Sequence, residues 1–101
     1  MRAACDLIAS FTAGMNFRDY KHDARARSAV ERQFQIVGEA LHQLVKAHPE
    51  VASRIPSSRD IINFRHVLVH GYDKVEDEVV WGVVKVNLPS LQDTLNHLLG
   101  P

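Results

Sequence analysis

The sequence predicts an all-helical bundle, and two observations carry this prediction. Apolar residues recur every three or four positions, the period of one helix face, over four stretches: 2–13, 23–47, 58–70 and 76–99. Residues that end helices separate these stretches, namely Gly14, Pro49 and Gly71. A chain of 101 residues of which 46% are apolar fits one domain over 1–101 with a modest core.

The first stretch, 2–13, predicts a helix that starts almost at Met1 with no capping residue before it, so we expect a shortened N-terminal helix. Its apolar face is formed by Ala4, Leu7, Ile8 and Phe11. Cys5 is the only cysteine, and its apolar neighbours predict a small buried side chain rather than a reactive thiol. One cysteine cannot form an internal disulfide, which fits a reducing cytoplasm.

The second stretch, 23–47, has a regular apolar seam for packing against other helices. The seam consists of Val30, Phe34, Val37, Leu41 and Leu44. Asn16 and Asp19 resemble a helix-start pair and predict a short capped turn before it. Glu39 lies one turn from the seam. Spacing alone favours a solvated carboxylate there, and the alternative is a side chain that faces the end of the third stretch.

The third stretch, 58–70, has Ser57 or Ser58 as its candidate cap and Gly71 as its end. In the fourth stretch the valine-rich residues 79–84 have strand propensity, but a longer apolar series keeps a helical period. That series is Val80, Val84, Leu88, Leu91, Leu95 and Leu98. A period held over that length outweighs local propensity. Pro89 then predicts a kink, or a break with a restart.

The charge balance limits the partners that the whole surface can attract. Lys and Arg total 12, Asp and Glu total 12, and the net charge is zero, so the chain has no bulk attraction to nucleic acid. Any contact with RNA or DNA must come from a local patch. No apolar run approaches the roughly 20 residues needed to cross a bilayer, and we see no export signal, so we expect no membrane partner.

The residues best suited to binding or catalysis lie where the third stretch ends. Arg65, His70 and Tyr72 have the spacing R-x-x-x-x-H-x-Y. The planar guanidinium of arginine donates paired hydrogen bonds to phosphate oxygens, and histidine accepts and donates protons near neutral pH. An intact helix places Arg65 and Tyr72 on one face, whereas His70 lies roughly 140° from Arg65. The pattern fits the handling of a phosphate ester.

Other interpretations of the same residues stay open. Arg65 could be a surface cation near a helix end, His70 a capping group, and Tyr72 a packing residue with a wet hydroxyl. His66 and His70 have a metal-compatible spacing of four, but no third ligand stands at an obvious spacing, so we predict no metal and no cofactor. The remaining histidines look solvated, and these are His22, His42, His48 and His97.

With its flanking segments, the motif resembles the signature of the HEPN superfamily, and within it the HepT-like ribonuclease toxins, which are partners of minimal nucleotidyltransferase antitoxins. The resemblance rests on Arg65, His70 and Tyr72, with a polar residue, His66, after the arginine. It extends over most of the chain through segments in the same order, at 12–17, 29–32, 36–40, 80–81 and 88–89.

The resemblance implies an up-and-down bundle of four to five helices that forms a homodimer, with the motifs of both copies in a cleft at the interface. It implies that the protein is a cytoplasmic toxin that cleaves RNA without a metal ion. The RNA would be transfer RNA or messenger RNA. Arg65 would hold the scissile phosphate and His70 would act as general acid or base, supported by His66 and Glu39. Tyr72 is the position that the antitoxin would adenylylate (AMPylation), and the added charge would repel RNA.

Two departures from the family pattern matter. The residue after the arginine is commonly asparagine, so His66 adds a second titratable ring and leaves open which imidazole moves the proton. The N-terminal helix is shorter than usual.

The sequence also fits a non-catalytic nucleotide-binding or adaptor subunit of a nucleotidyltransferase complex, or a structural helical dimer with a degenerate site.

Overall fold

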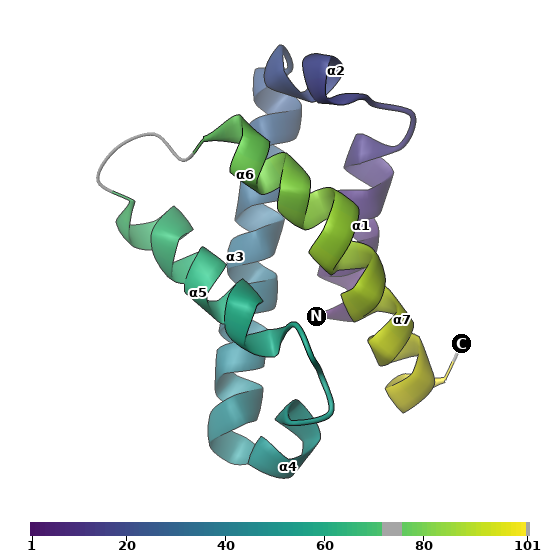
Figure 1. The fold of residues 1–101 in the computed structure, drawn as a ribbon, viewed down its shortest axis with the longest axis vertical. Helices are drawn as coiled ribbons and strands as arrows, with labels where there is room; N and C mark the ends of the chain where they lie inside the picture. Colours follow the sequence, from purple (N-terminus) through teal and green to yellow (C-terminus); the bar gives the residue numbers. More distant parts are fainter. Residues whose placement is uncertain (72–75, 101) are drawn as a thin grey trace.

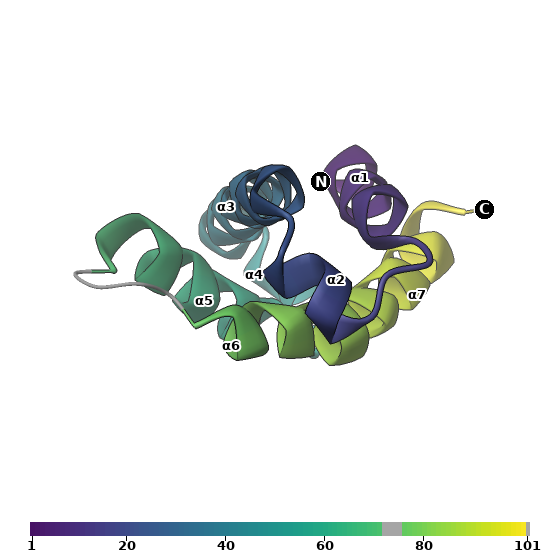
Figure 2. The same cartoon turned by 90° about the horizontal axis from the view of Figure 1, so that it is seen from above.

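Two layers of helices form the molecule, which measures 40 × 32 × 17 Å. The computed structural model describes residues 1–71 and 76–100. Figure 2 shows α1 and α3 in one layer, with α5, α6 and α7 in the other. In chain order the elements are α1 (Arg2–Thr12), α2 (Phe17–Lys21), α3 (Ala24–Ala47), α4 (Pro49–Ala52), α5 (Ser58–His70), α6 (Asp77–Gly82), the π-helical turn η1 (Val83–Asn87) and α7 (Leu88–Leu99).

The predicted all-helical bundle is confirmed, since every regular element in the described part of the chain is a helix. The four predicted stretches agree with the observed helices to within one residue at each end. The valine-rich residues 79–84 are helical, so the long apolar period did outweigh local strand propensity. In Figure 1 α5 crosses in front of the long helix α3, and this crossing positions the candidate site.

Side-chain caps fix the starts of α2 and α3. The Asp19 backbone N–H donates to Asn16 Oδ1 over 2.8 Å, and the Asn16 N–H donates to Asp19 Oδ2 over 3.2 Å, so the predicted capped turn is a capping box. Asp23 Oδ1 accepts from the Ala26 N–H at the start of α3. At α5, Ser57 is the N-cap residue, as predicted, but its hydroxyl makes no capping hydrogen bond. There the Ser57 backbone carbonyl accepts from Ile61.

Pro89 interrupts the helical hydrogen bonding without ending the helix. A π-helical turn, η1, lies just before it, and the Leu88 N–H donates to the Val83 carbonyl, five residues back. A proline has no N–H and its ring collides with the carbonyl four residues earlier in an α-helix. The wider turn gives that carbonyl room. The expected interruption therefore takes the form of a π-turn, and α7 follows directly (Figure 1).

One hydrophobic cluster between the two layers joins the helices. Its centre holds an edge-to-face pair, Phe34 of α3 and Phe64 of α5, with ring centroids 5.3 Å apart. Cys5 is fully buried, as predicted, and burial raises the pKa of its thiol to about 11. Leu7 was expected on the core face of α1 but is 42% exposed. The buried stripe of α1 lies further around the helix and consists of Ala4, Cys5, Ile8 and Thr12.

No helix within residues 1–71 and 76–100 has both the length and the hydrophobicity to span a bilayer.

Candidate functional site

Arg65 lies where α5 crosses α3, and a glycine makes that crossing close. A Cβ atom added to Gly38 of α3 would overlap the Cβ of Arg65 and lie 2.8 Å from its Cγ. Real Cβ atoms essentially never come that close to another heavy atom. Gly38 is buried in mid-helix, where a glycine normally weakens the helix. Its place here is explained by the aliphatic stem of Arg65, which packs against the bare backbone of α3.

The far end of Arg65 is held by a carboxylate from the same α3 turn. Its Nη2 atom lies 2.7 Å from Glu39 Oε2 in an ion pair whose side chains are 27% and 45% exposed. Gln43 Nε2 donates to the other carboxylate oxygen over 2.9 Å. The Gln43 hydrogen bond, followed by the Arg65 charge, lowers the pKa of Glu39. Glu39 is partly solvated, as spacing favoured, and it also contacts Arg65, as the alternative required.

The aliphatic stem of Arg65 is fixed by packing, and its guanidinium is partly exposed. The Arg65 Nε atom is buried and has no hydrogen-bond partner among the described residues. Arg65 also lines a shallow hollow of about 540 Å³ between α3 and α5, where Arg32, Ile36 and Val69 stand beside it. A small anion in that hollow could reach the guanidinium directly. The arrangement presents a preset cation to a ligand at little conformational cost.

His66 and His70 form a second group on α5. Their rings are in tilted contact, with centroids 4.6 Å apart and planes inclined by 48°, and both side chains are exposed. Because α5 stays helical through His70, Arg65 and His70 leave the helix in different directions. No hydrogen bond or ion pair joins the guanidinium to either imidazole in the part of the chain that the structure describes. Tyr72 lies outside the described residues.

The structure thus brings Arg65 together with Glu39, and His66 together with His70, but does not merge the two groups within one copy. No set of three candidate metal ligands gathers anywhere in 1–71 or 76–100. Sequence reasoning missed Gly38 as the residue that places Arg65, and Gln43 as the donor that fixes Glu39. The signal for Gly38 was present, because an isolated glycine inside a helical period usually has a packing reason.

The fold and the site define an all-helical protein that presents an arginine and exposed imidazoles at a helix crossing. Residues 1–98 match the family described as ribonuclease HepT-like. The chain therefore belongs to the HepT-like ribonucleases. This agrees with the resemblance seen in the sequence alone.

Individual relatives match over almost the whole chain. A protein from Thermococcus cleftensis named "Probable ribonuclease HepT" is 33% identical over 94% of this chain and 86% of its own length. "Putative RNase TTE0752" of Caldanaerobacter subterraneus subsp. tengcongensis is 27% identical over 94% of this chain and 84% of its own length. "Putative RNase MJ1380" of Methanocaldococcus jannaschii is 25% identical over 91% and 83%. No solved structure matches the chain.

Proposed function

We propose that this chain is a metal-independent endoribonuclease that acts in the cytoplasm as the toxin of a toxin–antitoxin pair. The observation that carries the proposal is Arg65, whose aliphatic stem packs over Gly38 and whose guanidinium, paired with Glu39, lines a hollow at the α3–α5 crossing. A fixed guanidinium offers paired donors to phosphate oxygens. Membership of the HepT-like ribonucleases makes an RNA phosphodiester the natural ligand for this hollow.

The chemistry that we propose needs no protein nucleophile. The ribose 2′-hydroxyl attacks the adjacent phosphorus while one imidazole takes its proton, and the bond from phosphorus to the leaving 5′-oxygen breaks as that oxygen receives a proton. The products are a 2′,3′-cyclic phosphate and a 5′-hydroxyl. Arg65 stabilises the charge that builds on the phosphate. His70 is our first candidate for proton transfer, and His66 supplies a second imidazole 4.6 Å away.

A homodimer would complete this site. Arg65 and His70 project from different sides of α5. A second copy of the chain is therefore the simplest source of an imidazole next to each arginine. Exposed apolar side chains beside the site support such a contact, since Ile36 is 37%, Val67 49% and Val69 45% exposed. Apolar groups of this kind gain free energy when a second surface covers them.

The antitoxin in our proposal is a minimal nucleotidyltransferase that transfers AMP to the Tyr72 hydroxyl. The motif places this residue two positions after His70. A bulky anion at the edge of the site would repel an RNA phosphate. Mass spectrometry of the chain after incubation with such an enzyme and ATP should find one added AMP, and Tyr72→Phe should abolish the addition.

The deciding experiment is cleavage of total RNA and of transfer RNA in the presence of a chelator. The parent chain should produce fragments with 2′,3′-cyclic phosphate ends, and Arg65→Ala and His70→Ala should each abolish cutting while circular dichroism reports unchanged helicity. Cutting at the parent rate by either variant would refute the assigned role. Intact RNA with the parent chain, together with a stable nucleotidyltransferase complex, would instead establish the adaptor alternative.

A further inference from the structure

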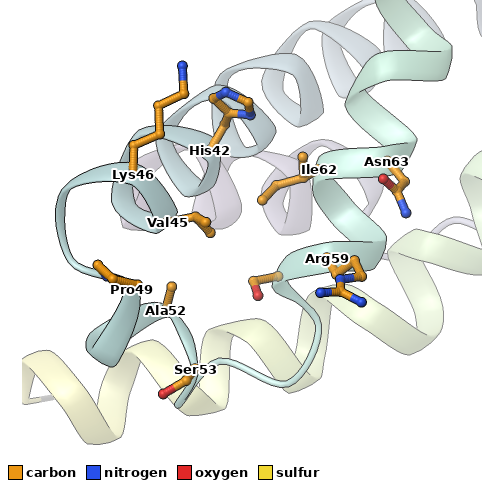
Figure 3. Close-up of a pocket in the computed structure, with 10 residues that line it drawn as sticks. His42, Val45, Lys46, Pro49, Ala52, Ser53, Arg59, Ile62 and Asn63 are labelled. Atoms are coloured by element: carbon orange, nitrogen blue, oxygen red, sulfur yellow. The ribbon is translucent and has the colours of Figure 1, made fainter.

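A second hollow lies between α3, α4 and α5, on the other half of the α3–α5 pair from Arg65. It encloses about 390 Å³, a size typical of small-ligand sites. Figure 3 shows it with Val45 and Ile62 pointing toward its centre from facing helices, and with Lys46 and Arg59 on opposite sides. We call this feature the basic hollow, and the lining residues that matter here are His42, Val45, Lys46, Pro49, Arg59 and Ile62.

The charge of the basic hollow has one sign. Lys46, Arg59 and the titratable His42 line it, and its lining includes no aspartate or glutamate. Glu39, one turn before His42 on α3, is already engaged by Arg65 and Gln43. In a protein of zero net charge, such a local excess of cations is the kind of patch that attracts an anion.

The base of the hollow is apolar. Val45 is 40% exposed, and Ile62, Pro49 and Ala52 also line the hollow. Exposed apolar surface framed by cations suits a ligand that has both a flat apolar part and an anionic part. A nucleotide has this combination, since a base can rest on the apolar side chains while its phosphate meets the cations at the rim.

The basic hollow is continuous with the candidate catalytic residues along α5. Arg59, Asn63, His66 and His70 follow one another at steps of four, three and four residues, so they form one stripe of the helix. All four side chains are exposed. The stripe is ~16 Å long at 1.5 Å per residue, which equals on the order of five stacked nucleotides at ~3.4 Å each.

We propose that the basic hollow is a binding subsite for single-stranded RNA, a few nucleotides away from the bond that is cut. One base packs on Val45 and Ile62, and the phosphates on its two sides contact Lys46 and Arg59, which lie on opposite sides of the hollow. The inference rests on the proposed ribonuclease function and adds to it the residues that hold the substrate next to the reacting phosphate. The continuous stripe toward His70 favours RNA over an acidic segment of a partner protein.

Binding of an uncleavable RNA tests the subsite separately from catalysis. The probe is a fluorescent single-stranded oligonucleotide with 2′-O-methyl riboses, and its dissociation constant is measured by anisotropy over a range of KCl concentrations. Lys46→Ala combined with Arg59→Ala should weaken binding roughly tenfold. The slope of log K against log salt should fall by about 1.4, because each phosphate contact on a single strand contributes ~0.7.

Matched controls separate this site from general charge. Arg18 and Arg25 line a different hollow beside α2, so Arg18→Ala combined with Arg25→Ala removes the same charge and should leave affinity and slope unchanged. Val45→Ser should weaken binding of the normal oligonucleotide, but should not weaken binding of one that lacks the base at the responsible position. All substitutions are at solvent-accessible side chains, and circular dichroism verifies the fold.

The outcomes distinguish the subsite from the proposed function. Parent-like affinity and salt slope in the Lys46→Ala, Arg59→Ala chain would overturn the subsite, even where the chain cuts RNA. Parent-like RNA binding combined with lost binding of a polyglutamate probe would assign the hollow to an acidic protein segment and also overturn it. Weakened RNA binding in this variant, in a protein that never cuts RNA, would support the subsite and refute the ribonuclease.

Discussion

Replacing Gly38 by alanine tests whether the α3–α5 crossing positions Arg65. Elsewhere in a helix this change stabilises by ~0.5–1 kcal/mol. Here the new methyl group overlaps Arg65 Cβ and Cγ, which are the root of the side chain and not its flexible end. The backbone fixes the position of Cβ, so this overlap is relieved only if the helices separate, and an overpacking cost of ~1–3 kcal/mol applies. The net expectation is a loss of about 1 kcal/mol in the free energy of unfolding.

Urea unfolding followed by circular dichroism measures this change. For a domain of this size, each kcal/mol corresponds to a shift of ~4–8 °C in Tm. RNA cleavage should fall more than stability predicts, because Arg65 moves with the displaced helix and a 1 Å misplacement can reduce a rate ~100-fold. The assay compares rates at a temperature where both chains are fully folded.

Gly82 provides the matched control. It is also helical, at the end of α6, but a Cβ added there meets no atom within 4 Å. Gly82→Ala should therefore stabilise the protein by ~0.5–1 kcal/mol and leave cleavage unchanged. If Gly38→Ala also stabilises the protein and retains full cleavage, the close crossing and its role in holding Arg65 are both wrong.

Three further predictions concern the site and the core. Gln43 and Arg65 lower the pKa of Glu39. The stabilisation from the ionised Glu39 carboxylate is therefore present above the unfolded pKa of about 4.3 and is lost as pH falls through the lower folded pKa. Glu39→Gln should lack this acid-dependent part of the Tm profile, and identical profiles would contradict the pairing. Cys5, fully buried with a raised thiol pKa, should react with iodoacetamide only after urea unfolding, so rapid labelling of the native chain would refute its burial. Phe34→Ala removes one ring of the buried aromatic pair with Phe64 and should cost ~3–5 kcal/mol in urea unfolding; a loss below 1 kcal/mol would contradict the packing.

The helices could be predicted from the sequence because their signals are local. The apolar period and the punctuation by Gly14, Pro49 and Gly71 depend only on neighbouring residues, and the observed boundaries of α3 and α5 follow them closely. The capping box at Asn16 is equally local. The motif residues could likewise be found, because the spacing of Arg65 and His70 is a property of one segment.

What could not be predicted depends on contacts between segments. Spacing alone leaves open whether Glu39 is solvated or faces Arg65, because no spacing rule connects residues 26 positions apart on two helices. The close approach at Gly38 requires the crossing of α3 and α5 to be known. Leu7 matches the helical period of its stretch, yet α1 buries a neighbouring stripe. The π-turn before Pro89 is one of several ways to accommodate a proline, and the surrounding packing selects among them.

The ion pair between Arg65 and Glu39 has a consequence for how RNA binding responds to salt. A protein cation that neutralises an RNA phosphate releases cations condensed on the RNA, and this release makes affinity fall as salt rises. Arg65 already carries a tethered carboxylate as its counterion. A phosphate that contacts Arg65 would meet a guanidinium whose charge is already balanced, so this contact neutralises little phosphate charge and releases few of the condensed cations. In the site that we propose, a count of contacts taken from salt titration will therefore omit Arg65 and report mainly the cations farther along the strand.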